Sequence, residues 1–189
     1  MRKMLSSKSM IILTLLLTLL IGSVCAAVYY SMIMQSTVTV SGAKIIFVAG
    51  ADYPSGSSMG TNSTWVRLAL KAYPNATLIY DKPLNVSNTD AGASHQFRLR
   101  HVSILPASGS VSVSNFTFIN FVVKNTVGTP QGSFNYTVPS GDTWSTPSPT
   151  SYFTLPASTQ WVIYVETKAK AGANTNIVAN IQISVDVQE

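Results

Sequence analysis

The stretch Ile181-Gln-Ile-Ser-Val-Asp-Val-Gln188 alternates apolar and polar side chains without interruption. Successive side chains of an extended chain point to opposite faces, so this period of two is typical of a half-buried β-strand. The apolar positions are isoleucine and valine, whose branched side chains favour strands. The C-terminal region is therefore predicted to be a strand with one face in a hydrophobic core.

The same period recurs along most of the chain, and clusters of Gly, Pro, Asn, Asp and Ser separate the runs as turns would. Nine strands are predicted, at residues 28–40, 43–49, 64–72, 76–80, 94–105, 110–124, 132–138, 159–169 and 176–188. No helical pattern of ten or more residues occurs after residue 27. These features predict an all-β fold, a jelly-roll-like β-sandwich formed by one domain over residues 43–189.

The N-terminus has the three parts of a secretory signal peptide. Three cations come first, then an apolar run, and then a series of small residues. Residues 1–27 are therefore predicted to be a signal peptide, cleaved after Ala26 or Ala27, so that the mature protein is extracellular. Weaker hydrophobicity continues to Met34, so an uncleaved membrane anchor of about 20 residues is the alternative.

Charge is scarce in this sequence, because only 10% of residues are charged, against roughly 25% in an average soluble domain. The whole chain carries 12 Lys+Arg and 7 Asp+Glu, but three of the cations lie in the predicted signal peptide. The remainder has 9 cations and 7 acids, a net charge of +2, which supplies no basic patch for nucleic acid. The one cysteine, Cys25, also lies in the signal segment, so the mature chain has no disulfides.

Residues for catalysis or metal binding are few. His95 and His101 are the two histidines, and in a strand they would lie about 20 Å apart, too far to share one metal ion. The sequence has no His-Glu-x-x-His zinc motif and no Gly-x-Ser-x-Gly serine motif. We therefore predict no catalytic residues, no metal site, no cofactor and no small-molecule substrate.

Aromatic and asparagine residues offer two kinds of surface site. The tryptophans Trp65, Trp144 and Trp161 are expected in the core or at a seam, and Trp144 is the candidate for a ligand or inter-filament contact because its surroundings predict a loop. Five Asn-x-Ser/Thr sequons are candidates for glycosylation. Their asparagines are Asn62, Asn75, Asn85, Asn115 and Asn135.

Residues 28–40 form an uncharged strand directly after the predicted cleavage site. One face carries Val28, Tyr30, Met32, Met34, Val38 and Val40, with Ser36 interrupting it. An exposed edge of this kind promotes aggregation, so the strand should be buried. It can pair within its own sandwich, or it can add to the sheet of another copy and generate an open filament.

The predicted segments follow one another in a distinctive order. The signal peptide leads at once into the uncharged strand, and a second strand follows at residues 43–49, with Ala-Gly-Ala-Asp at 49–52. A long alternating strand at residues 174–189 ends the sequence. This order resembles the TasA/camelysin-like family of biofilm fibre proteins, and most closely the archaeal bundling pilins. The resemblance implies a pilus or filament subunit for adhesion and biofilm formation. Its N-terminal donor segment, residues 28–42, would insert into the next copy, and the filaments would bundle laterally. The alternative is a monomeric surface adhesin or carbohydrate-binding sandwich.

Overall fold

The computed structural model describes residues 8, 10–16, 42–106, 111–139, 142–173 and 177–188. The chain divides into two units, residues 1–40 and 41–189. Residues 8 and 10–16 of the first unit are helical. No helix in the described part of the chain is both long and apolar enough to cross a membrane. The predicted strand at residues 28–40 lies outside the described residues.

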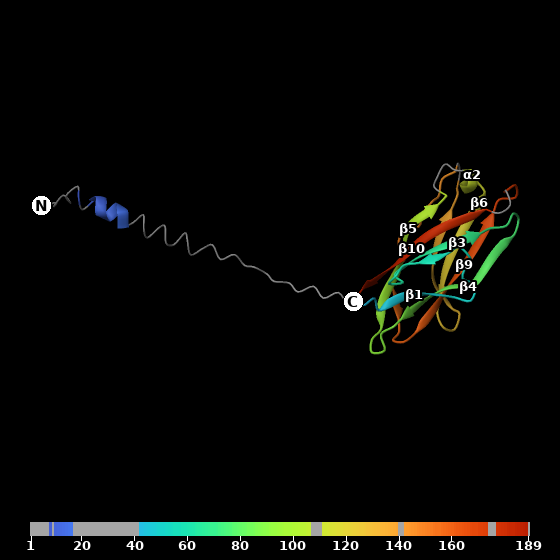
Figure 1. The fold of residues 1–189 in the computed structure, drawn as a ribbon, viewed down its shortest axis with the longest axis horizontal. Coiled ribbons are helices and arrows are strands. Elements are labelled where there is room, and N and C mark those ends of the chain that lie inside the picture. The colour runs from blue at the N-terminus through green and yellow to red at the C-terminus, as the bar shows by residue number, and fades with distance from the viewer. Residues whose placement is uncertain are drawn as a thin grey trace. The chain divides into compact units, whose positions relative to one another are not determined.

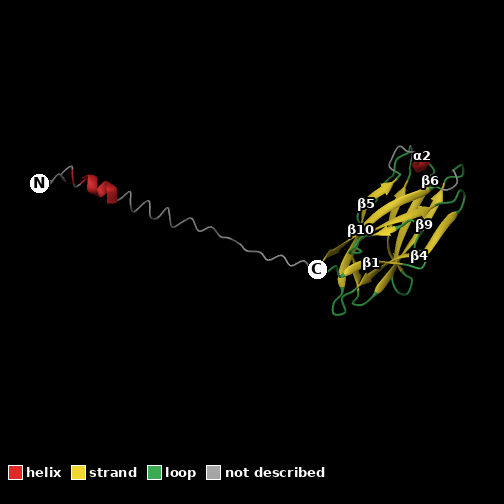
Figure 2. Cartoon of the chain, viewed as in Figure 1, coloured by secondary structure: helices red, strands yellow, loops and turns green. Residues whose placement is uncertain are grey.

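The described residues of the second unit form ten strands and one short helix (Figures 1 and 2). In chain order these are β1 (Ile45–Ala49), β2 (Ser58–Met59), β3 (Trp65–Lys71), β4 (Thr77–Asn88), β5 (His95–Leu105), α2 (Val111–Ser114), β6 (Phe116–Lys124), β7 (Pro130–Thr137), β8 (Phe153–Leu155), β9 (Gln160–Ala169) and β10 (Val178–Gln188).

The strands form two sheets of five. Sheet A has the order β1-β4-β9-β6-β7, and sheet B has the order β2-β3-β10-β5-β8. All the strand pairs described in the two sheets are antiparallel. The fold is therefore an all-β antiparallel sandwich, and this part of the sequence prediction is confirmed.

The core lies between the inward faces of the two sheets, as the period of two requires. Every second residue of β9 is buried from Trp161 to Ala169, and Ile181 and Ile183 of β10 are fully buried. An aromatic group joins β6 and β7, where the ring of Phe121 meets those of Phe134 and Tyr136 edge to face, with the centroids 6.2 and 5.9 Å apart. Burial of apolar surface on this scale is the main stabilising contribution to such a fold.

Four details differ from the sequence prediction. Strands β2 and β8 were not predicted, because two and three residues are too few to show a period. Strand β4 continues to Asn88 rather than ending at Tyr80, since residues 81–83 form a bulge and not a turn. The predicted strand at 110–124 begins only at Phe116, because residues 111–114 form the helical turn α2.

Candidate functional site: the open edge at β1

Strands β1 and β2 lie at the edges of different sheets, and a groove of about 490 Å³ separates them. The groove is lined by Ile46, Phe47, Val48, Ala49, Tyr53, Ser57, Ser58, Met59 and Ser63. None of these nine described lining residues carries a charge. The groove therefore exposes backbone and apolar atoms between two sheet edges, which is the arrangement that an added strand requires.

The backbone of β1 alternates between its partner β4 and the groove. Lys44 accepts a hydrogen bond from Thr89 N–H at 2.8 Å, which places the even-numbered residues of this segment toward β4. The backbone groups of Ile45, Phe47 and Ala49 consequently face away from β4. Among these outward groups of the described chain, one hydrogen bond is recorded, from Phe47 N–H to Ser63 C=O at 2.7 Å.

The opposite edge of sheet A is covered at one end. Thr137, at the end of β7, exchanges two backbone hydrogen bonds with Ser145, at 3.3 and 2.7 Å. The neighbouring Trp144 is 6% exposed and donates its indole Nε1–H to Pro106 C=O at 3.1 Å. Its ring also packs against Phe116, with the centroids 5.4 Å apart. The segment after residue 142 thus covers the end of β7.

Side chains and short segments cover the edges of sheet B. Ser57 Oγ accepts a hydrogen bond from Ala69 N–H of β3 at 2.9 Å, beyond the two residues of β2. On the other edge, Thr150 continues the pairing with β5: its N–H donates to Leu99 C=O at 3.0 Å, and its Oγ1 accepts Leu99 N–H at 3.0 Å. The edge of β1 is therefore exposed over most of its length, with one recorded outward backbone bond in the described sandwich.

One polar group of the groove stands out because it is buried. The hydroxyl oxygen of Tyr53 has no hydrogen-bond partner among the described residues, and burial raises the pKa of this phenol. A buried hydroxyl without a partner costs free energy.

The predicted donor residues Val28, Tyr30, Met32, Met34, Val38 and Val40 lie outside the described residues, so their pairing remains a prediction. The sequence could not identify the other wall of the groove, which comes from residues 53–63. That wall consists of turns and the two-residue β2, which have no hydrophobic period.

The five sequons occupy different environments. Asn62 and Asn75 are exposed in the turns before β3 and β4, and Asn135 is exposed on β7. Asn85 is half-buried within β4, although the sequence predicted a turn or strand end there. Asn115 is half-buried and precedes β6, so its predicted place within a strand was wrong.

The tryptophans mostly follow the core prediction. Trp161 is 8% exposed and Trp144 is 6% exposed, so the hypothesis of a ligand contact at Trp144 is wrong. Trp65 is half-buried, and its indole covers Gly60 so closely that a Cβ there would overlap the ring. These side chains close the sandwich and present no aromatic platform.

The two histidines make separate contacts. His101 Nδ1 lies 2.9 Å from the hydroxyl of Tyr136, and His95 Nε2 lies 3.0 Å from Asp90 Oδ2. The hydrogen bond to His95, with help from Gly92 N–H, lowers the pKa of Asp90 to about 2. No group of three or more potential metal ligands occurs in the described parts of the chain.

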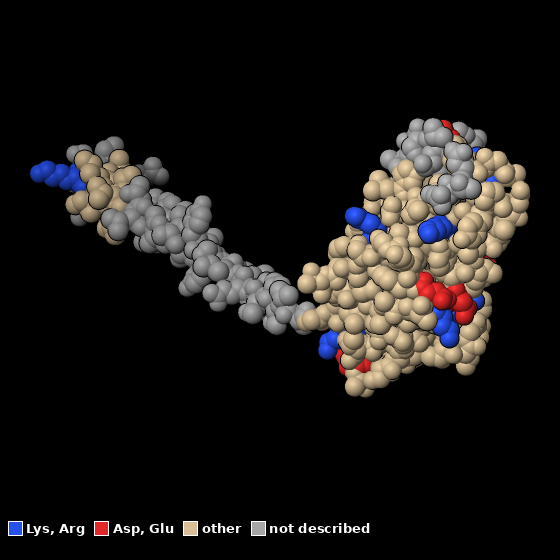
Figure 3. All heavy atoms as spheres, turned by 45° about the vertical axis from the view of Figure 1, so that its right-hand side comes forward, with Lys and Arg blue, Asp and Glu red and all other residues tan. Residues whose placement is uncertain are grey.

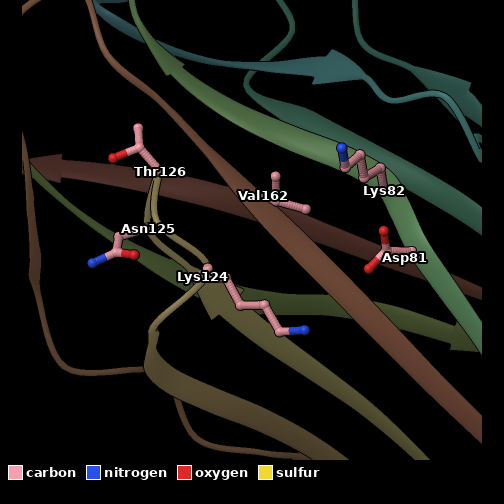
Figure 4. Close-up of a pocket in the computed structure, with 7 residues that line it drawn as sticks. Asp81, Lys82, Lys124, Asn125, Thr126 and Val162 are labelled. Carbon is pink, nitrogen blue, oxygen red and sulfur yellow. The ribbon is translucent and has the colours of Figure 1, made fainter.

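A second cavity, of about 300 Å³, lies on the outer face of sheet A (Figure 4). Asp81 and Lys82 reach it from β4, Val162 from β9, and Lys124 from the end of β6. Lys124 Nζ lies 3.6 Å from the ring centroid of Tyr164, a cation–π contact. The seven described lining residues include one carboxylate and no histidine or cysteine, so they form no nucleophile–base pair.

Charged groups are sparse on the surface. Figure 3 shows a face on which small blue and red areas are separated by wide uncharged surface. Some of these charges neutralise one another, since Asp186 forms ion pairs with Arg98 and Arg100 at 3.2 and 3.1 Å. The described surface therefore offers no continuous charged patch for nucleic acid.

Comparison with known proteins adds little. No protein-family model and no curated protein matches this chain. It is similar to part of the enzymatically active domain of tailspike protein 4 of bacteriophage CBA120, with a TM-score of 0.35 and 13% identity over 79% of this chain. It is also similar to part of the arabinose-bound α-L-arabinofuranosidase MgGH51, with a TM-score of 0.25 and 13% identity over 81% of this chain. The matches cover 20% and 25% of those two chains, and at these TM-scores they carry no argument about function.

Proposed function

We propose that the protein is a structural subunit of an extracellular filament. Residues 28–40 of one copy would pair with the outward edge of β1 in the next copy. The observation that carries this proposal is the open, uncharged edge of β1 beside the groove. Adding a strand there would pair the outward backbone groups of Ile45 and Ala49 and the carbonyl of Phe47, whose N–H already donates to Ser63.

The donor and the groove are compatible in length and chemistry. Thirteen extended residues reach about 43 Å at roughly 3.3 Å per residue, and the five residues of β1 span about 16 Å. The donor can therefore cover β1 and continue past it. Its six apolar side chains on one face would enter the groove, where the half-buried Tyr53 and Met59 contribute apolar surface.

The order of strands supports a jelly-roll subunit. Strands β4-β9-β6-β7 face β3-β10-β5-β8, and the chain passes from one sheet to the other at most connections. This is the order of a jelly roll, in which two Greek keys form the paired sheets. Strands β1 and β2 are additions at one edge, so the proposed groove lies outside the basic eight strands.

Donor strand and groove are different surfaces of the same chain, so the contact is heterologous and continues without closing. The product is a head-to-tail homopolymer. The predicted signal peptide supports export, and the resemblance to archaeal bundling pilins supports a role in adhesion and biofilm formation at the cell surface. The function needs no cofactor or catalytic residue.

The alternative arrangement is a hairpin within one copy. Only four residues, 41–44, separate the predicted strand from β1, which is a suitable length for a hairpin loop. The same edge would then be covered within the subunit, and the protein would be a monomeric adhesin. An experiment must therefore distinguish pairing between copies from pairing within a copy.

Proline at Ala49 tests the edge directly. Ala49 is exposed, and its backbone N–H faces the groove, so Ala49→Pro removes an outward donor without removing a bond to β4. Ala51→Pro is the matched control, because Ala51 follows Gly50 in a turn closed by Tyr53 N–H and Gly50 C=O at 3.3 Å. Proline is favoured at that second turn position.

The chain beginning at Val28 and its Ala51→Pro variant should form filaments in negative-stain electron microscopy, and Ala49→Pro should form at least ten times fewer. Thermal unfolding of each variant shows whether the fold is retained. Monodisperse wild-type particles at all concentrations would refute the filament and support the hairpin.

A further inference from the structure

The sequon at Asn62 has an internal hydrogen bond. In the turn between β2 and β3, the hydroxyl of Thr64 donates a hydrogen bond to Asn62 Oδ1 at 2.8 Å. Thr64 N–H also approaches the same oxygen, at 3.4 Å. The turn is held by Ser63 N–H to Gly60 C=O at 2.8 Å, and Ser63 has a positive φ of 55°. The asparagine and the threonine of this sequon are therefore already in contact in the folded chain.

Asn75, Asn85 and Asn135 are arranged differently. The structure records no hydrogen bond between any of these three described asparagines and the hydroxyl residue of its sequon. Asn85 and Asn135 lie in extended strands, where side chains two residues apart are separated by about 7 Å. Exposure alone would favour Asn75 and Asn135 as well, so the contact with Thr64 is what distinguishes Asn62.

We propose that Asn62 is a glycan acceptor site of the folded protein. The substrate would be a saccharide linked through a diphosphate to a lipid, presented by an oligosaccharyltransferase. Asn62 Nδ2 would form a bond to the anomeric carbon, the bond from that carbon to the diphosphate oxygen would break, and an amide proton would pass to a base of the transferase. Because Oδ1 is held by Thr64, the amide nitrogen remains available for this step.

The position of Asn62 links the sugar to the open edge. Asn62 directly precedes Ser63, which lines the groove and accepts the hydrogen bond of Phe47 N–H. A saccharide on Asn62 would thus lie at the rim of the groove and add polar, hydrated bulk beside an edge that has little charge. This modification is independent of filament formation and goes beyond the proposed function.

The test uses the folded, unmodified chain with a single-subunit oligosaccharyltransferase and a lipid-linked diphosphate saccharide. Peptide mass spectrometry measures the occupancy of each sequon over time. Asn62 should be modified at least five times faster than Asn85 and Asn135. Thr64→Val should abolish modification at Asn62, Thr64→Ser should restore it, and Thr77→Val, the matched change in another sequon, should leave Asn62 unaffected.

Two results would overturn the proposal. One is an unmodified Asn62 in a reaction that modifies Asn75 or Asn135. The other is modification of Asn62 only after the chain is unfolded in urea, since the contact with Thr64 belongs to the fold. Occupancy is measured on peptides and does not require filaments, so failure here leaves the filament proposal standing.

Discussion

At the scale of single residues, a few buried polar groups tie the two sheets together. Asn88, at the end of β4, is 2% exposed, and its Nδ2 donates to the carbonyls of Ala93, Leu155 and Pro156 at 2.8, 3.2 and 3.1 Å. Its Oδ1 accepts Asp90 N–H at 2.9 Å. The end of a strand in sheet A is thereby joined to β8 of sheet B.

The pair His101 and Tyr136 makes a second link between the sheets. Burial raises the pKa of Tyr136, so the phenol stays protonated, and its hydroxyl shares a hydrogen bond of 2.9 Å with His101 Nδ1. Burial also lowers the pKa of His101 below its usual value. The unfolded chain therefore binds a proton at His101 more readily than the folded chain does.

This difference predicts a dependence of stability on pH. Because the pKa of His101 is lower in the folded state, the free energy of unfolding should fall as pH decreases below about 6.5. The His101→Gln variant should lose less stability than the wild type between pH 7 and pH 5, as measured by urea unfolding. His95 is present in both proteins, so the comparison isolates the effect of His101. Equal losses in the two proteins would refute this assignment.

At the scale of elements, the sandwich differs in how its edges are covered. The end of β7 is closed by Ser145 and Trp144, whereas β1 has one recorded hydrogen bond from its outward groups in the described chain. The outward groups of β1 are therefore available for strand addition, while the end of β7 at Thr137 is not.

Trp144→Ala tests the covered edge. Removing this buried indole should lower the free energy of unfolding by about 3–5 kcal/mol, the range for a large aromatic in a core. Hydrogen exchange at the amide of Thr137 should accelerate, because its bond to Ser145 depends on the docked segment. Phe153→Ala, on β8, is the control: it should destabilise the core without a selective effect on Thr137. Unchanged exchange in Trp144→Ala would mean that the segment docks without its tryptophan.

At the scale of the whole molecule, low charge and one open edge act together. After loss of the predicted signal peptide, 9 cations and 7 acids remain, so copies repel one another weakly. Weak repulsion permits filaments to associate laterally, which fits the bundling that the family resemblance implies. The direction of growth would come from the donor strand.

A chain beginning at Ser41 should stop filament growth. It keeps the groove but has no donor strand. It can therefore bind the donor strand of the subunit at the end of a filament, but it cannot insert a strand into another copy. Adding it to the chain that begins at Val28 should shorten filaments as its proportion rises, as measured by electron microscopy. The same truncation with Ala49→Pro should have little effect on length. Filaments formed by the truncation alone would contradict a role for residues 28–40.

Much of the sandwich could be predicted from sequence because its strands are long and half-buried. In β9 and β10 the buried face needs an apolar residue at every second position, so the strand can be recognised from a short stretch of sequence. The bulge at residues 81–83 could not be predicted, since the residues Asp, Lys and Pro are also typical of a turn. Only pairing with β9 on both sides of the bulge makes it part of β4.

The sequence by itself determined that the sandwich is all-β with a two-faced pattern and that residues 28–40 carry no charge, because a period of two and a low charge are local properties. Tertiary structure alone decided that β1 lies at a sheet edge and which residues lie beside it. Phe47 contacts Ser63 only because the sheets bring their segments together. A local sequence pattern does not show which strands become neighbours. Trp144 is a second example, because its neighbours in sequence are typical of an exposed loop. Its indole is nevertheless buried by contacts with Phe116 and Pro106, which are distant in sequence.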